Sequence, residues 1–139
     1  MPPPKFQQVT IVQRYLAAVS HQDWEVVESC LTDEVHRVGP FGDVYSGRDA
    51  YLAFLRQTMP SLKGYRMDID RLTTTGDETV AVAELRETVE LDGTPVVTRE
   101  CIVCDVDASG LIRQISIYIQ RSPADLAAGV VDVGGSERM

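Results

Sequence analysis

The sequence lacks long apolar runs and any concentration of basic residues. No stretch approaches the roughly 20 apolar residues that cross a bilayer, and the first residues do not carry the apolar segment of a signal peptide. Lysine and arginine together number 13 against 21 acidic residues, which gives a formal charge of −8. These features argue against nucleic acid and membranes as partners and lead us to expect a cytoplasmic protein.

Histidine and cysteine are also scarce, with two and three residues. Cys101 and Cys104 have the spacing of a redox or zinc pair, but residues three apart in a strand point to opposite faces. No second Cys/His pair, phosphate-binding glycine loop or Ser-His-Asp set accompanies them. We therefore expect no metal and no cofactor.

The 139 residues, of which 44% are hydrophobic and 24% charged, fit one globular domain. Apolar residues at helical spacing predict a first helix over 7–20, and Asp23 is a suitable N-cap for a second. A third helix is predicted from Arg48 to Pro60. We expect the domain to span 7–121, after a flexible N-terminus over 1–6 and before a partly disordered tail over 122–139.

The remainder reads as a sheet. A short strand is predicted over 35–38, and alternating patterns predict longer strands over 65–70, 80–91, 96–106 and 111–120. Asp92-Gly93 is a strong hairpin signal between the second and third of these long strands. Helices followed by an antiparallel meander predict an α+β fold with the helices on one face of a curved sheet.

Two glutamates lie on the more apolar faces of the two longest strands. Glu87 shares its face with Ala83 and Leu85, and Glu100 shares its face with Ile102 and Cys104. Burying a carboxylate costs several kcal/mol unless it is paired, hydrogen-bonded or protonated. A cavity lined by these faces is therefore expected, with the two glutamates as general acid and base.

The sequence leaves the hairpin register open. If Glu87 lies opposite Glu100, the two carboxyls share a proton and titrate as a pair. A shift of one residue would instead put Glu87 beside Arg99 on a solvated face. A satisfied, non-catalytic ion pair or a solvated pocket rim is the structural alternative for each glutamate.

The opposite face of the sheet is too apolar for a surface that lies fully in water. We expect a second copy of the chain to cover it, so that a homodimer forms through the sheet. The predicted members of this outer face are Val80, Val82, Val97, Cys101, Val103, Ile112 and Tyr118, mixed with Glu84, Arg86 and Arg99.

Several segments resemble bacterial ketosteroid isomerases. The likeness rests on 12–18 (VQRYLAA), 23–24 (DW), 31–35 (LTDEV), 40–50 (PFG and SGRDA) and 107–112 (DASGLI). The whole plan over roughly 7–120 is similar to the nuclear transport factor 2-like superfamily, which includes SnoaL-like polyketide cyclases and limonene-epoxide hydrolases. The resemblance implies a cone-shaped α+β fold, with a pocket between sheet and helices and often a dimer through the sheet.

Within that resemblance, Tyr15 matches the isomerases' oxyanion donor on the first helix. The position of their aspartate base is Gly39, and the position of their second, protonated acid is Ile102, with Glu100 one inward-facing place earlier. Two of the three catalytic groups are thus absent, which argues against ketosteroid isomerisation by the family mechanism.

Arg37 lies two residues before Gly39, and we expect it to point into the pocket and neutralise one glutamate. An arginine between two carboxylates resembles the epoxide hydrolase arrangement. We therefore expect a pocket for a small apolar, cyclic molecule, with Tyr15, Glu87, Glu100 and Arg37 as candidate catalytic residues for isomerisation, cyclisation, dehydration or hydrolysis. The alternative is a non-catalytic ligand-binding or dimeric interaction module on the same fold.

Overall fold

The computed structural model describes residues 6–121, with side chains described from residue 11 onward. The predictions for 1–5 and 122–139 lie outside the described residues. Three α-helices and one short 3₁₀ helix form: α1 (Phe6–Ser20), α2 (Trp24–Cys30), α3 (Arg48–Thr58) and η1 (Met59–Ser61). None of these helices is long and apolar enough to cross a membrane.

Six strands form a single open, curved sheet in the order β2-β1-β6-β5-β4-β3. Only β1 and β6 pair in parallel, and the other neighbours are antiparallel. The strands are β1 (Leu31–Val38), β2 (Val44–Ser46), β3 (Arg66–Thr74), β4 (Val80–Leu91), β5 (Thr94–Val106) and β6 (Ile112–Ile119). The predicted α+β class is therefore confirmed.

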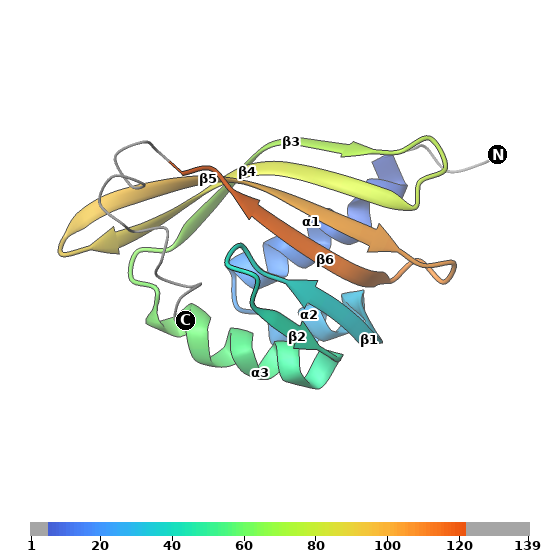
Figure 1. Cartoon of the computed structure of the whole chain (residues 1–139), viewed down its shortest axis with the longest axis horizontal. Coiled ribbons are helices and arrows are strands. Elements are labelled where there is room, and N and C mark those ends of the chain that lie inside the picture. Colours follow the sequence, from blue (N-terminus) through green and yellow to red (C-terminus); the bar gives the residue numbers. More distant parts are fainter. Residues whose placement is uncertain (1–5, 122–139) are drawn as a thin grey trace.

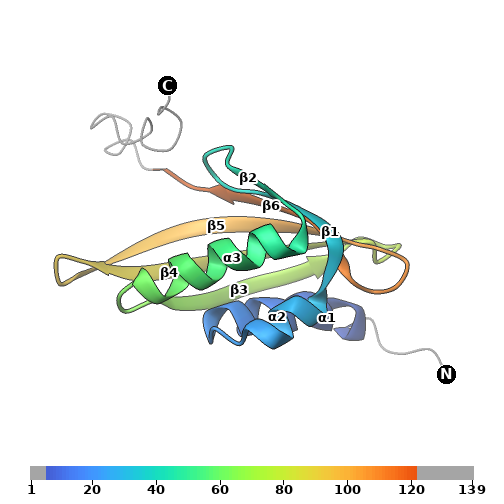
Figure 2. The same ribbon diagram turned by 90° about the horizontal axis from the view of Figure 1, so that it is seen from below.

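The helices lie together on one side of the sheet, and α3 runs in nearly the same direction as β3 and β4 (Figures 1 and 2). Their apolar faces pack on the inner face of β4, β5 and β6 and form one core with fully buried members from both layers. These members include Leu16 of α1, Val27 of α2, Leu85 of β4 and Ile115 of β6.

Local sequence explains where the elements begin and turn. The carboxylate of Asp23 accepts a hydrogen bond from the amide of Val26 at 3.4 Å, as expected for the N-cap of α2. Asp92 and Gly93 both have positive φ, 54° and 78°, which is the backbone of a type I′ turn between β4 and β5. The predicted cap and hairpin are thus confirmed.

The structure differs from the predicted elements at the strands β1 and β2, at the start of α1 and at Ile112. The first strand begins at Leu31 rather than Val35, and β2, which pairs with its end, was not predicted. The helix α1 already includes Phe6. Ile112, assigned to the outer face by strict alternation, is fully buried because a register shift after Asp105 pairs Val106 with Ile112.

Candidate functional site

A cavity of about 320 Å³ lies between the helices and the inner face of the sheet. Most of its wall is apolar, and the polar side chains in it come from six different elements or their ends. The apolar part includes Leu16, Val19, Phe41, Phe54, Leu55, Met59, Leu62, Met67, Val89, Ile102, Ile117 and Ile119. The polar part consists of Tyr15, Arg37, Tyr51, Thr58, Tyr65, Glu87, Thr98 and Glu100.

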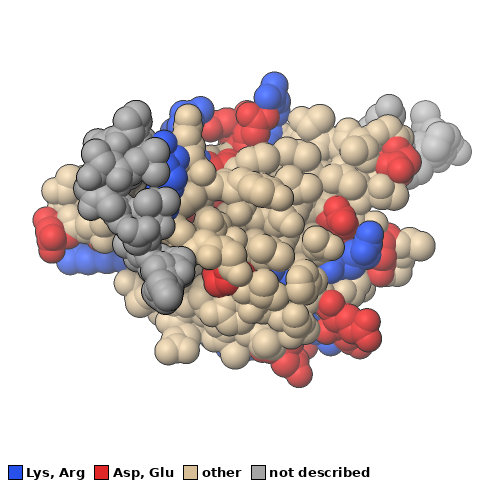
Figure 3. Space-filling view, viewed as in Figure 1, with Lys and Arg blue, Asp and Glu red and all other residues tan. Residues whose placement is uncertain are grey.

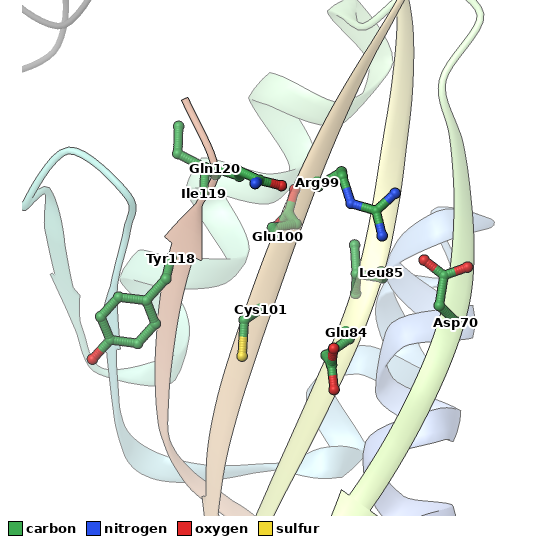
Figure 4. Close-up of a pocket in the computed structure, with 9 residues that line it drawn as sticks. All are labelled: Asp70, Glu84, Leu85, Arg99, Glu100, Cys101, Tyr118, Ile119 and Gln120. Carbon is green, nitrogen blue, oxygen red and sulfur yellow. The ribbon is translucent and has the colours of Figure 1, made fainter. Parts of the chain in front are cut away.

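A second hollow of about 300 Å³ lies on the outer face of the same sheet (Figure 4). Its border carries charged and polar groups that face solvent, among them Asp70, Glu84 and Arg99. Two of these groups form ion pairs at the surface. Arg86 pairs with Asp70 at 2.8 Å, and Arg71 pairs with Glu84. The inner cavity is the better candidate site because it gathers buried and half-buried polar groups within a mostly apolar wall.

Glu100 is the most buried carboxyl of the inner cavity, with 8% of its surface exposed. Burial raises its pKa well above that of an ordinary glutamate, and a hydrogen bond and like charge from Glu87 raise the pKa further. The positive charge of Arg37 acts in the opposite direction. Since two adjacent carboxyls cannot both ionise easily, this arrangement favours the protonated form of Glu100.

The hairpin register brings the two glutamates together diagonally. Glu87 lies opposite Thr98, and Glu100 lies opposite Leu85, so the glutamates are offset by two residues. The register with Glu87 directly opposite Glu100 is therefore wrong, and so is the one with Glu87 beside Arg99. An offset of two keeps both side chains on the same face and within reach of each other.

Tyr65, which immediately precedes β3, donates a hydrogen bond from its hydroxyl to Oε2 of Glu87. Burial and the charge of Glu87 raise the pKa of this phenol, so it remains protonated. Tyr65 therefore fixes the orientation of Glu87 from the open edge of the sheet. Its place on the inner face follows from its alternation with Met67 and Ile69, although the sequence did not mark it as functional.

Tyr15 of α1 and Tyr51 of α3 join their hydroxyls in a hydrogen bond at the cavity wall. Each is only 2% exposed, and burial raises the pKa of both phenols. A hydroxyl pair shares one proton internally and has a second to donate outward. Tyr15 thus lies on the cavity as predicted, and Tyr51 is its unpredicted partner.

Arg37 of β1 also lies on the cavity wall, as predicted, and is 7% exposed. Its Nη1 donates to Oδ2 of Asp43 at 2.7 Å, so the ion pair is made with the loop before β2 rather than with a glutamate. The guanidinium also lies 4.9 Å above the ring of Phe54, within cation–π distance. Asp43 was not predicted as the partner of Arg37, because β2, which it precedes, was not predicted either.

The positions of the isomerase acids have different occupants here. Gly39 has no side chain that could act as a base, and Ile102 is an apolar residue of the core. Within the described part of the chain, no group of three or more His, Cys, Asp or Glu side chains is placed to hold a metal ion. The groups that can move protons here are the carboxyl pair and the three tyrosines.

The chain thus combines a curved sheet, covering helices and an inner cavity with two neighbouring glutamates in an α+β fold. The SnoaL-like domain family matches residues 12–115, so the chain belongs to this family within the nuclear transport factor 2-like superfamily. No curated protein matches the sequence.

Solved structures with the same fold include enzymes. The chain is 21% identical to an epoxide hydrolase of the limonene-epoxide hydrolase type from M. tuberculosis, with a TM-score of 0.74 over 94% of this chain and 97% of that one. It is 18% identical to SalBIII, an epoxide hydrolase/cyclase-like enzyme of pyran ring formation in salinomycin, with a TM-score of 0.71 over 82% and 91%.

A third relative is a hypothetical protein with a ketosteroid isomerase-like fold from Catenulispora acidiphila, solved in complex with trimethylamine. Its identity is 16% and its TM-score 0.69, over 85% of this chain and 89% of the other. At these identities the likeness concerns the fold, and the chemistry must be argued from the residues of this chain.

Proposed function

We propose that the chain is a cofactor-independent acid–base enzyme that acts on a small, apolar, cyclic molecule. The observation that carries the proposal is the Glu87–Glu100 pair, two carboxyls on the same face of β4 and β5 at the wall of an apolar cavity. A carboxyl whose pKa is raised toward the working pH serves as a general acid, and its ionised neighbour serves as a base. Isomerisation, cyclisation, dehydration and hydrolysis can all use such a pair.

Five of the polar groups of the cavity have a role in this mechanism. Glu100 delivers the proton because its burial favours the protonated form. Glu87 accepts a proton, with Tyr65 holding its carboxylate in place. The Tyr15–Tyr51 hydroxyl pair donates a hydrogen bond to negative charge that develops on the ligand's oxygen.

The cavity limits the size of the ligand. At the packing density of a protein interior, about 0.74, a space of about 320 Å³ accommodates roughly a dozen non-hydrogen atoms. A molecule of one or two rings with one oxygen function fits this limit. The epoxide hydrolase and cyclase-like relatives support a cyclic ether, epoxide or alcohol as the first substrates to examine.

Carboxyl titration tests the acid–base pair without knowledge of the substrate. In protein with ¹³C-labelled glutamate, NMR is expected to find Glu100 titrating above pH 7, assigned by its loss in Glu100→Gln. The same change at Glu87 should bring the titration of Glu100 closer to the ordinary value of about 4.3, because the like charge is gone. Two glutamates that both titrate near 4.3 in the wild-type protein would remove the proposal.

A non-catalytic binding module is the second candidate. It is favoured by the absence of carboxyls at Gly39 and Ile102, the two acid positions of the isomerase resemblance. The relative solved with trimethylamine also presents this fold with a small bound molecule. A panel of cyclic epoxides, enones and alcohols separates the two candidates, since an enzyme converts at least one while a binding module only retains it.

We further propose that the outer face of the sheet forms a homodimer. Val97 and Tyr118 on this face are 55% and 61% exposed, which is unusual for large apolar side chains in water. The view from this side shows a broad uncharged area with charged side chains beside it (Figure 3). A second copy laid on this area would bury these side chains.

Val103→Arg is expected to convert the dimer to a monomer, because it places a charge in the middle of the proposed interface. Light scattering coupled to gel filtration measures the mass. Leu91→Arg is the matched control, since Leu91 is 57% exposed at the end of β4 beside the hairpin turn. A wild-type protein that elutes as a monomer, or a Val103→Arg protein with unchanged mass, would exclude this interface.

A further inference from the structure

The loop between β1 and β2 folds back tightly enough to place Asp43 against Arg37. The amide of Gly39 donates to the carbonyl of Asp43 at 2.7 Å, and the amide of Gly42 donates to the carbonyl of Gly39 at 3.1 Å. Gly42 has a φ of 79°, which permits the turn. The carboxylate of Asp43 thereby reaches Nη1 of Arg37 at the cavity wall.

Gly39 leaves the space in which this ion pair forms. A Cβ atom on Gly39 would lie 2.6 Å from both Nη1 of Arg37 and Oδ2 of Asp43, closer than real Cβ contacts. The φ of Gly39 is not in the left-handed region, so its backbone does not require glycine. Gly42 is the opposite case, because its φ requires glycine while a Cβ there would meet nothing within 4 Å.

Arg37 is the only arginine or lysine that lines the cavity among the described residues. It faces Asp43 on one side and acts on Glu100 and the phenols of Tyr15 and Tyr51 on the other. Its Nε is buried without a hydrogen-bond partner in the described part of the chain, so the guanidinium has a donor left to offer. Glu100 in turn faces Glu87 from β4, Tyr65 before β3 and Arg37 from β1.

From this geometry we infer that Asp43 is a positioning residue, which holds Arg37 and compensates its charge so that the carboxyl pair keeps its proton. Gly39 contributes by leaving room for the ion pair between Arg37 and Asp43. This inference rests on the proposed acid–base function, because it concerns the proton of the Glu87–Glu100 pair. Asp43 would thus affect the chemistry of the cavity although it is a loop residue outside the cavity wall.

Asp43→Asn tests the inference directly. The asparagine keeps the shape of the side chain but leaves the charge of Arg37 uncompensated, so the titration midpoint of Glu100 is expected to fall by about 1–3 pH units. Carboxyl NMR measures the midpoint, and the acid limb of the activity profile should move by the same amount once a substrate is found. Asp43→Glu, which restores the negative charge, is expected to recover most of the shift.

Glycine variants supply an independent pair of tests. Gly39→Ala should reproduce the fall in the midpoint, because its methyl group displaces the ion pair. Gly42→Ala strains the same loop through its φ without touching the pair, so the midpoint should stay at the wild-type value even if thermal stability falls. Equal shifts in both variants would overturn the inference, because loop strain would then explain the effect.

A double variant tests whether Asp43 changes the titration of Glu100 through Arg37. In an Arg37→Met background, Asp43→Asn is expected to shift the Glu100 midpoint by less than about 0.3 pH units, because the charge that Asp43 compensates is absent. An unchanged midpoint in the single variant Asp43→Asn would refute the inference while leaving the acid–base proposal intact. A wild-type midpoint near 4.3 would instead refute the acid–base proposal itself.

Discussion

Glu100→Gln is expected to stabilise the folded chain at neutral pH. Because the folded state holds the proton of Glu100 more tightly than the unfolded chain does, stability falls as pH rises from about 4.3 toward the raised pKa. Glutamine is uncharged at every pH in this range, so the variant does not lose stability in this way. The variant should gain about 1.4 kcal/mol of unfolding free energy for each pH unit between about 4.3, the pKa of Glu100 in the unfolded chain, and the pH of the measurement. The gain stops growing once the pH passes the raised pKa of the folded state.

Urea unfolding of both proteins from pH 4 to pH 8 measures this gain. The two curves should lie close together at pH 4 and separate as pH rises, with the variant above the wild type. Glu84→Gln is the matched control on β4, because Glu84 lies on the outer face with its side chain 45% exposed. A Glu100→Gln protein that is less stable than wild type throughout would show that Glu100 is ionised and paired in the folded state.

The same variant should lose turnover while keeping its ligand. Removal of a general acid lowers the rate by about 10²–10⁴-fold, whereas the apolar wall that binds the ligand is unchanged. Steady-state rates and calorimetric binding to the same compound measure the two quantities. A variant with full turnover would assign the proton transfer to another group, and one that lost only affinity would favour the binding module.

Ile112→Ala is expected to destabilise the protein by about 2–5 kcal/mol, the range for deletion of a fully buried aliphatic side chain. The side chain of Ile112 has no exposed surface, although simple alternation along β6 would place it outside. Ile69→Ala is the matched control with the same chemical change, and because Ile69 is 40% exposed its cost should stay below about 1 kcal/mol.

Urea unfolding measures both losses of unfolding free energy from the shift in midpoint, provided that the slope of free energy against urea concentration is unchanged. Equal effects at the two positions would mean that β6 follows regular alternation and that Ile112 faces outward. The comparison therefore tests the register shift after Asp105 through its energetic consequence.

The sequence predicted the fold well because its signals are local and periodic. Helical spacing marked α1 and α3, the side chain of Asp23 marked the start of α2, and Asp92-Gly93 marked the β4–β5 turn. Bulges and short edge strands lack such signals. The irregularity near Ile112 depends on pairing with β5, and β2 is three residues long and held by its partner β1.

The candidate site was predictable only in part, for a related reason. Parity along each strand placed Glu87 and Glu100 on one face, since an even offset in register does not change the face. The partners of the predicted residues arise from contacts between distant segments: Tyr65 with Glu87, Tyr51 with Tyr15, and Asp43 with Arg37. The spacing of residues within a single segment of the sequence does not predict contacts of this kind.

Glu100 and Ile102 are successive inward-facing residues of β5, so a side chain at one is displaced from the other by about 6.6 Å along the strand. The displacement runs toward the hairpin end, where β5 becomes exposed, and away from the deep core around Cys104. The isomerase resemblance assigns its second acid to Ile102. Moving that acid by two residues would bring the reacting end of a bound ligand closer to the hairpin end of β5 and leave the space beside Ile102 to the apolar part of the ligand.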